Sequence, residues 1–338
     1  MNNVFLYLVR TVCYTYNHES YIIDALKGFA MQETSFPVVY TIVDDASTDK
    51  TAEVLRRFVN EHFDVDSNSG GYDKDTDYGH VTFAQHKTNK NCYFAVIYLK
   101  ENHYSQKKSK APYLTEWMDT KYVAMCEGDD YWTYPLKLQK QVDFLEEHEE
   151  YAMCFHSAVL LNECDAKVTS SYSIIKEGDY GPNDIFPMWV VPTASVVYRR
   201  EKVDSYKLIH ADWFVFGDIV IFEKCAHVGK LWGFEERMSV YRMNGNSVLQ
   251  NVKYRDGRIQ AMPLHFKALK MNFPLIDKEV LNQLIADSYY AKMRNDSHAL
   301  VKGIDFFRFV FISPSYSVKR LLRKLEKKYR EGITPNKF

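Results

Sequence analysis

The sequence predicts an α/β fold with a largely parallel sheet, followed by a helical C-terminal extension. Two patterns carry this prediction. In the first half of the chain, apolar runs rich in β-branched and aromatic residues alternate with segments of helical spacing, which is typical of βαβ units. Beyond about Asn246 the apolar spacing becomes helical to the end. We therefore expect one domain over residues 1–248, with halves meeting near residue 130, and a helical extension over residues 249–338.

The individual elements follow from the same spacing rules. Strands are predicted at Leu8–Tyr14, Val38–Val43, Tyr122–Cys126, Ala152–Leu161 and Ser195–Tyr198, and helices at Ile22–Phe29, Ala52–Phe58, Leu138–Leu145 and Phe214–Cys225. In open α/β sheets ligands bind beyond the carboxyl ends of the strands. The polar segments after the first two strands, Thr15–Glu19 and Asp44–Asp49, are therefore the first candidates for a binding site.

Composition limits the classes of function. The chain has 43 Lys and Arg against 44 Asp and Glu, a net charge of -1, so no global field attracts nucleic acid. The six cysteines are scattered without CxxC spacing, which favours a reduced, cytoplasmic setting, and Cys154, His156 and Cys164 are interpreted as structural and not as zinc ligands. We expect neither a signal peptide nor a membrane-spanning helix.

The segment Asp64–Gly79 is acidic and contains alternating Asp73, Asp75 and Asp77, a spacing found in calcium loops. Tyr78 stands where such a loop needs glycine, and no glutamate closes it. We interpret the segment as a solvated surface loop.

Acidic residues also follow the strand predicted at Tyr122–Cys126. Glu127 and Asp129 alternate, so their carboxylates can lie on one side of an extended turn and hold Mg²⁺ or Mn²⁺ while diphosphate oxygens complete the coordination. The alternative is that Asp129 or Asp130 caps the following helix. From the residues alone, both interpretations stay open.

Four motifs together resemble the family 2 glycosyltransferases of the GT-A fold. They are VCYTYNHESY at Val12–Tyr21, VDDASTDKT at Val43–Thr51, MCEGDDYW at Met125–Trp132 and the long stretch FGDIVIFEKCAHVGKLWGFEERMSVYRMNGNSV at Phe216–Val248. Their order and spacing match over about the first 250 residues. The resemblance implies a Rossmann-like GT-A domain for nucleotide-diphospho-sugars, with an acceptor half at about residues 131–248, and inverting transfer of a sugar to an acceptor hydroxyl.

The resemblance also implies residue roles on the donor side. Thr15, Tyr16 and Glu19 would line the base and ribose, with Tyr16 stacked on the base, while Asp44 and Asp45 would recognise the base edge or ribose. The alternative makes Tyr16 a packing residue and the two aspartates turn formers.

EGDD stands where the family places its DxD motif. The resemblance implies that Glu127, Gly128 and Asp129 contact the nucleotide-sugar, with Asp129 as the metal ligand and Glu127, one methylene longer, as a less direct one. Asp218 would be the general base that deprotonates the acceptor, the alternative being charge compensation at a helix start.

The chain departs from the family after the "YR" pair. Arg242, Met243 and Asn244 stand where a histidine often binds the metal or diphosphate, so Asn244 would offer an amide oxygen and Arg242 would pair with diphosphate. Trp189 lies where the family forms its acceptor wall.

The C-terminal segment combines an apolar stripe at Leu321, Leu322 and Leu325 with many lysines and arginines. It fits either a helix lying on a membrane surface or a solvated helix packed on the protein. We expect a Mn²⁺- or Mg²⁺-dependent glycosyltransferase acting on a sugar, glycan or glycolipid acceptor in bacterial cell-surface polysaccharide or glycolipid synthesis, with UDP as the expected nucleotide. It would be cytoplasmic, with peripheral contact at the inner face of the plasma membrane under the first interpretation. A nucleotidyltransferase and a non-catalytic nucleotide-sugar-binding module are the rival interpretations.

Overall fold

The computed structural model describes residues 6–66, 70–163, 167–169, 171–187, 190–244 and 252–333. The chain divides into two compact units, the first comprising Met1–Tyr206 with Lys224–Asn244 and the second Lys207–Glu223 with Gly245–Phe338. The expected boundary at residue 248, together with Trp189 and Cys164, lies outside the described residues.

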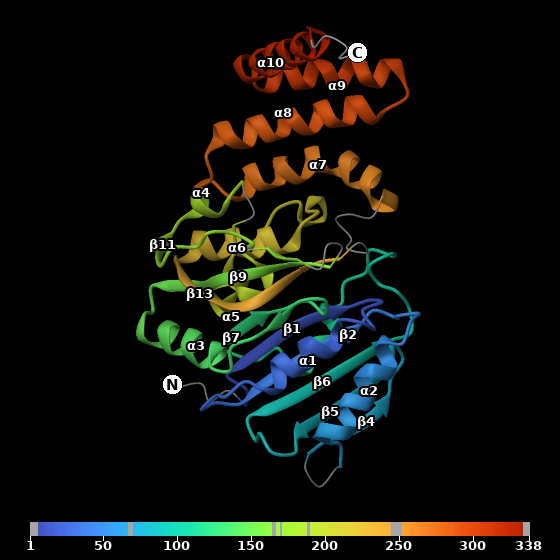
Figure 1. Cartoon of the computed structure of the whole chain (residues 1–338), viewed down its shortest axis with the longest axis vertical. Helices are drawn as coiled ribbons and strands as arrows, with labels where there is room; N and C mark the ends of the chain where they lie inside the picture. The colour runs from blue at the N-terminus through green and yellow to red at the C-terminus, as the bar shows by residue number, and fades with distance from the viewer. Residues whose placement is uncertain are drawn as a thin grey trace, which may run out of the picture. The chain divides into compact units, whose positions relative to one another are not determined.

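The centre of the first unit is a parallel sheet (Figure 1). Its four strands are β1 (Val9–Thr15), β2 (Val38–Asp44), β6 (Cys92–Leu99) and β7 (Tyr122–Met125), in the order β7-β1-β2-β6. All three pairings between them are parallel. The carboxyl ends of these strands therefore meet at one edge, as expected for an α/β fold.

The flanks of the same sheet are mostly antiparallel. One flank has β5 (Gly79–His86), β3 (Phe63–Asp64) and β4 (Tyr72–Asp75); the other has β12 (Val197–Arg199), β9 (Tyr151–Asn162), β13 (Lys230–Met243) and β11 (Gly178–Tyr180), with the short β8 (Tyr131–Trp132) and β10 (Lys167–Thr169) paired at the side. Only β9 and β13 are parallel among the flank pairings of the described residues. The predicted α/β class with a parallel central sheet is confirmed, and β5 and β6 are strands that were not predicted.

Helices cover both faces of the sheet. One face is covered by α1 (Ile22–Ala30), α2 (Thr51–His62) and α3 (Lys137–Glu147), and the other by the 3₁₀ helix η2 (Ala111–Trp117). Later in the chain come the short helices α4 (Pro182–Ile185), η3 (Thr193–Ser195) and α5 (Arg200–Ser205). Alternate residues of β2 enter opposite cores: Val38 and Tyr40 pack with α1 to α3, whereas Val39 and Val43 pack with η2. Burial on both faces explains why this strand reads as a continuous apolar run.

The surface loop expected at Asp64–Gly79 is instead partly a strand. β4 pairs antiparallel with β5, and Asp73 and Asp75 both contact His80, at 2.7 and 2.9 Å. Side chains two apart in a strand share a face. The alternation of acids that resembled a calcium loop is thus the period of an exposed strand whose carboxylates meet a cross-strand histidine.

The second unit is helical. It holds η4 (Ala211–Trp213), the start of α6 (Gly217–Val228), and then α7 (Val252–Asn272), α8 (Lys278–Asn295), α9 (Ala299–Ile312) and α10 (Pro314–Ile333). The Asp277 side chain caps α8 by accepting from the backbone of Glu279 and Val280. The predicted helical extension is confirmed. Among the described residues, no helix has the length and apolar character needed to span a bilayer.

Candidate functional site

Three loops that the motifs single out meet at the carboxyl edge of the parallel sheet. Thr15, the last residue of β1, lies opposite Asp44 of β2, and the Asp45 amide donates to the Thr15 carbonyl at 2.9 Å. On the other side of β1, the Gly128 amide donates to the Tyr14 carbonyl at 3.0 Å. The segments after β1, β2 and β7 are therefore neighbours.

Hydrogen bonds between residues about thirty positions apart connect the first two loops, which follow β1 and β2. The Asn17 amide donates to Ser47 Oγ at 2.9 Å, and the Thr48 amide donates back to Asn17 Oδ1 at 2.8 Å. Asn17 has a φ of 55°, a left-handed conformation that asparagine tolerates better than most residues. Tyr16 beside it is 42% exposed, so its ring is available to a ligand.

Glu19 takes part in the same set of hydrogen bonds between the two loops. Its Oε2 accepts from the Lys50 amide at 2.8 Å, and its own amide donates to Asp49 Oδ2 at 3.1 Å. The carboxylate is thus held against the start of α2, where the positive end of the helix dipole favours it.

Asp44 and Asp45 are both buried. Asp44 accepts from the amide and hydroxyl of Ser47, and burial raises the pKa of its carboxyl above the usual value. Asp45 accepts from the amides of His103 and Tyr104, at 2.7 and 3.0 Å, and pairs with Lys110 at 3.0 Å. Asp45 therefore ties the β2 end to the loop after β6.

That loop, from about Glu101 to Lys110, was not part of the predicted site. Its residues form no motif with VDDASTDKT, and only the β2–β6 pairing brings them to Asp45. The Lys110 ammonium also lies 5.1 Å from the centre of the Tyr14 ring. The sequence offered no signal for this contact.

Gly128 allows the third loop to pack against the first. A Cβ on Gly128 would lie 2.7 Å from Thr15 Cβ and 2.7 Å from Thr15 Oγ1, closer than real side-chain contacts come. It would also lie 3.1 Å from His18 Nδ1. Glycine is therefore required by the close approach of the two loops.

Asp129 is contacted by side chains from two distant segments of the chain. Asn244 Nδ2 donates to Asp129 Oδ2 at 3.0 Å, and His18 Nε2 lies 4.0 Å from the same oxygen. Burial lowers the pKa of His18, which favours the neutral imidazole. Asn244 was expected near the metal, whereas His18 was not singled out.

Two buried polar atoms at this point have no hydrogen-bond partner within the described part of the chain: Thr15 Oγ1 and His18 Nδ1. Buried polar groups are normally satisfied, so unsatisfied ones in a loop cluster point towards a ligand or water. Both residues line the approach of the first loop to Gly128.

Arg242 sits behind this loop and is 6% exposed. Its side chain donates to Glu163 Oε1 at 2.8 Å, to the Asp129 carbonyl at 2.9 Å and to Asp24 Oδ2 at 2.6 Å. The guanidinium also stacks near the rings of Tyr21 and Tyr131, with its carbon 5.1 and 4.7 Å from the ring centres. With all three of its nitrogens engaged, Arg242 is placed to hold the Asp129 loop.

Asp130 and Glu127 complete the turn. The Asp130 amide donates to the Glu127 carbonyl at 3.2 Å, and Asp130 Oδ1 accepts from the Arg242 amide at 2.8 Å. Burial raises the pKa of Asp130 well above its usual range, and the negative charge of nearby Asp129 raises it further. The Glu127 side chain is half-buried beside this turn.

Asp218 belongs to the second unit and lies in the first turn of α6. It is half-buried, and its Oδ1 accepts from the Ile219 amide at 2.9 Å. Its place in the first turn of α6 is the one expected for charge compensation at a helix start.

The side chains around Asp129 suit a divalent cation whose remaining ligands come from the substrate. Within the described ranges, no three His, Cys, Asp or Glu side chains gather as a metal site. Mg²⁺ is commonly bound through one or two carboxylates with phosphates and water completing its shell. Asp129, with the His18 imidazole and the amide of Asn244 near it, fits that arrangement.

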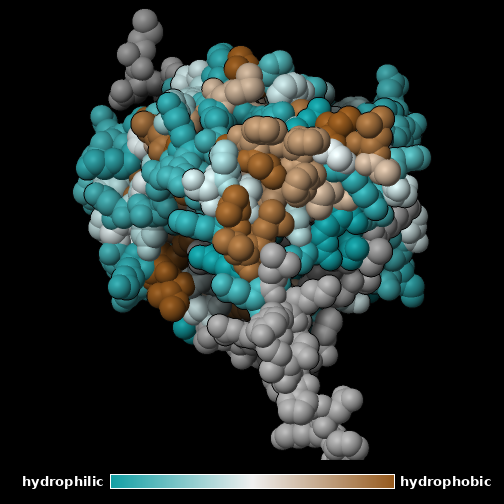
Figure 2. All heavy atoms as spheres, turned by 90° about the horizontal axis from the view of Figure 1, so that it is seen from above, coloured by the Kyte–Doolittle hydropathy of each residue, from teal (hydrophilic) through white to brown (hydrophobic). Residues whose placement is uncertain are grey.

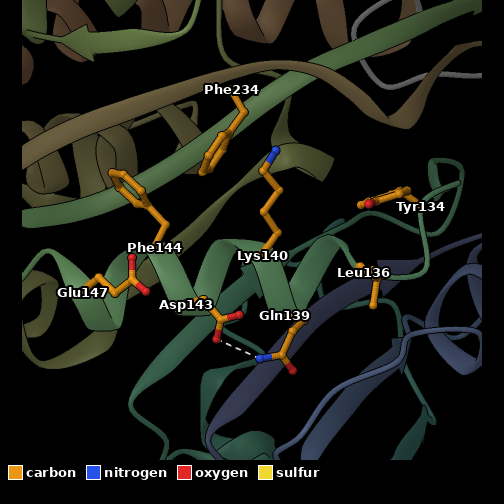
Figure 3. Close-up of a pocket in the computed structure, with 8 residues that line it drawn as sticks. All are labelled: Tyr134, Leu136, Gln139, Lys140, Asp143, Phe144, Glu147 and Phe234. Carbon is orange, nitrogen blue, oxygen red and sulfur yellow. Dashed lines mark hydrogen bonds between the residues drawn. The ribbon is translucent and has the colours of Figure 1, made fainter.

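A separate pocket of about 420 Å³ lies along the outer face of α3 (Figure 3). The figure shows Phe144 and Phe234 at one end of it, and Gln139 donates to Asp143 at 2.7 Å on the helix surface. None of the predicted site residues lines it, and Phe234 is its one lining residue from the four motifs. We place the candidate site at the strand ends because the polar groups converge there.

Comparison with known proteins agrees on the fold. No family model matches the chain. The uncharacterized proteins Rv1520 of Mycobacterium tuberculosis and Mb1547 of Mycobacterium bovis are each 31% identical to it over 255 residues, 73% of this chain and 62% of theirs. The chain thus spans less than two thirds of these relatives.

Among solved structures, S. aureus TarS 1-349 in complex with UDP aligns over 91% of this chain and 82% of its own, with 13% identity and a TM-score of 0.52. Mannosyltransferase PcManGT from Pyrobaculum calidifontis, in complex with GDP-Man and Mn2+, aligns over 93% and 83%, with 14% identity and a TM-score of 0.49. The likeness to TarS supports the GT-A class of α/β fold for this chain.

Proposed function

We propose that the chain is a glycosyltransferase that moves a sugar from a nucleoside diphosphate sugar to an acceptor hydroxyl with inversion. The observation that carries the proposal is the convergence of the Thr15, Asp45 and Asp129 loops at the carboxyl ends of β1, β2 and β7. Ligands of open α/β sheets bind at that edge. The motif resemblance supplies the reaction class.

The nucleotide would bind against the first two loops. The exposed Tyr16 ring offers a face on which a base can stack. The carboxylates of Asp44 and Glu19 belong to the same two loops and can accept hydrogen bonds from base or ribose groups. Because TarS is in complex with UDP, uridine donors are the first class to test.

The diphosphate would lie at Gly128 and Asp129. A divalent cation bound there would neutralise the charge that develops on the departing nucleoside diphosphate. Asp129 would hold it, with Glu127 as a less direct ligand and Asn244 orienting the Asp129 carboxylate. Arg242 keeps the loop in place from behind.

The acceptor oxygen would attack the anomeric carbon as the bond to the diphosphate oxygen breaks, and the acceptor proton would pass to Asp218. A carboxylate is a suitable base because the hydroxyl becomes acidic only as its bond to carbon forms. We propose an acceptor of cell-surface polysaccharide or glycolipid type, met at the cytoplasmic face of the membrane.

A thermal-shift panel of UDP-, GDP- and dTDP-sugars, with and without Mn²⁺, tests the donor site. We expect a metal-dependent shift for one donor class in the wild type and its loss in Asp129→Asn. Asp119→Asn is the matched control, since Asp119 is 88% exposed and pairs only at the surface with Arg200.

The reaction products distinguish the proposed glycosyltransferase from the two alternative functions. Release of nucleoside diphosphate with a glycosylated acceptor supports the proposal, release of pyrophosphate would indicate a nucleotidyltransferase, and binding without turnover would indicate a binding module. A panel in which no donor binds would contradict the proposal.

A further inference from the structure

α9 presents an apolar stripe to solvent. Leu300, Ile304, Phe307 and Phe311 are 77%, 43%, 61% and 74% exposed. Their spacing of four, three and four residues places all of them on one side of the helix. Phe307 and Phe311 stack on each other, with ring centres 6.2 Å apart.

The opposite side of α9 is fixed within the second unit. Phe309 is fully buried and its ring centre lies 5.0 Å from that of Tyr290 on α8. Asp305 is also buried, and its carboxylate lies 3.8 Å from Lys292 and 3.3 Å from Arg308. Because these contacts hold α9 against α8, the exposed stripe is the outer face of the helix.

α10 also exposes apolar side chains, and cations lie beside them. Val318 and Leu322 are 52% and 53% exposed, and Lys319 and Arg323 beside them are exposed. Arg320 turns the other way and pairs with Asp287 on α8 at 2.9 Å. The outer side of α10 is therefore apolar and basic together.

The charge around the stripe is mostly positive. Between Ala299 and Ile333 the chain has nine lysines and arginines against three acidic residues, although the whole chain carries a net charge of -1. Figure 2, viewed from the α9–α10 end, shows apolar groups gathered in a patch bordered by hydrophilic side chains. Contiguous exposed apolar patches mark interaction sites, and single exposed apolar residues do not.

We propose that this outer face of α9 and α10 binds the surface of an anionic lipid bilayer. Phenylalanine and leucine side chains would enter the interface between headgroups and acyl chains, while the flanking lysines and arginines would contact anionic headgroups. α9 has 14 residues, so it lies on the bilayer surface without crossing it. The basic flank favours lipid over a second copy of the chain, whose identical cations would repel across the interface.

Vesicle flotation of the full chain tests the proposal. Wild type is expected to float with vesicles of phosphatidylcholine and phosphatidylglycerol, and to stay behind with phosphatidylcholine alone or in high salt. Phe307→Ser with Phe311→Ser, and separately Lys319→Glu with Arg323→Glu, should each reduce the bound fraction about tenfold or more. All four side chains point to solvent, so circular dichroism should report unchanged folding.

Two controls match these changes. Ile174→Ser removes an 84% exposed apolar side chain elsewhere, and Lys230→Glu with Lys278→Glu reverses the same amount of charge at exposed positions outside α9 and α10. Both should float like wild type. Failure of wild type to float would overturn the proposal, as would flotation that survives in both test variants.

Light scattering on the same proteins tests whether this face instead binds a second copy of the chain. If wild type is a dimer that Phe307→Ser with Phe311→Ser converts to a monomer, and flotation is unaffected, the face is a contact between copies and the membrane proposal is overturned. Donor binding in the thermal-shift panel does not involve these residues, so either result leaves the proposed transferase activity separately testable.

Discussion

Arg242→Gln is expected to lower the free energy of unfolding by roughly 3 kcal/mol, because it removes a buried cation from three hydrogen-bonded partners and leaves the Asp24 and Glu163 carboxylates without it. Urea denaturation measures the loss. Arg57→Gln, at an exposed position of α2, should change stability by less than about 1 kcal/mol. Equal effects of the two substitutions would argue against a positioning role for Arg242.

Gly128→Ala is expected to weaken donor binding and to cost roughly 1–3 kcal/mol of stability, since the new methyl group overlaps the Thr15 side chain. Gly257→Ala is the comparison. Gly257 lies within α7. Apart from its chain neighbours and the backbone of its own helix, no atom of the described residues comes within 4 Å of the place that a methyl group on it would take, so alanine there should stabilise by about 0.5–1 kcal/mol. Unchanged donor binding in Gly128→Ala would mean that the two loops can separate without harm.

At the scale of single residues, the sequence located the motif loops but not all of their contacts. Asp129 meets Asn244 as the motif order implied, yet it also meets His18, which is held in place by hydrogen bonding of its amide to Thr51. No spacing rule relates residues more than a hundred positions apart in the chain. The roles of Asp218 and Glu127 remain predictions that the donor and acceptor assays address.

At the scale of elements, α3 carries an unusual residue in its first turn. Lys137 is fully buried, its Nζ donates to Gln141 Oε1 at 2.7 Å and lies 4.1 Å from the Trp132 ring centre. Burial lowers the pKa of Lys137 from 10.5 to about 7. The folded state therefore favours the neutral amine, whereas the unfolded chain binds a proton up to about pH 10.

This shift makes stability rise with pH between about 7 and 10, because the unfolded state binds the extra proton there. Cys126 and Cys154 face Lys137 and have raised thiol pKa values, which lowers stability above about pH 9, so the useful window is pH 7 to 9. Lys137→Met should be more stable than wild type, by a margin that shrinks by roughly 2 kcal/mol across that window.

Urea midpoints at several pH values measure this margin, with Lys230→Met as the control at an exposed position. Wild type and Lys137→Met curves that run parallel with pH would show that Lys137 stays charged when folded. The neighbouring His156 has a lowered pKa from burial and does not titrate above pH 7.

The elements themselves were predicted unevenly. β1, β2, β7 and α1 to α3 follow the expected ranges within a few residues, because buried parallel strands and amphipathic helices have distinct apolar periods. β4 was missed because its alternating aspartates resemble a loop motif, and the strand period was visible only once β5 was seen to pair with it. Local pattern cannot supply a partner strand.

At the scale of the whole molecule, the first unit is assembled from two separated stretches of chain. Lys224–Asn244, which contains β13, joins Met1–Tyr206, and β13 pairs with β9, β11 and β8. A chain ending at residue 223 would leave β9 without this partner and would lack both Arg242 and Asn244. We expect it to lose metal-dependent donor binding.

A chain ending at residue 244 provides the comparison, since it also lacks α7 to α10 but keeps β13. It should retain the donor-induced thermal shift. Loss of the shift in both truncated chains would mean that the second unit is needed for donor binding, and retention in both would remove the Asp129–Asn244 contact from the site.

The ion pair between Arg242 and Asp24 joins residues far apart in the sequence of the first unit, and the same guanidinium donates to the Asp129 carbonyl. Protein synthesis on the ribosome delivers Asp24 long before Arg242. The nascent chain can therefore form β1, β2 and their hydrogen-bonded loops early, while the cation that holds the Asp129 loop arrives only when β13 leaves the exit tunnel. A growing polypeptide would thus lack a complete candidate site until its first unit is finished.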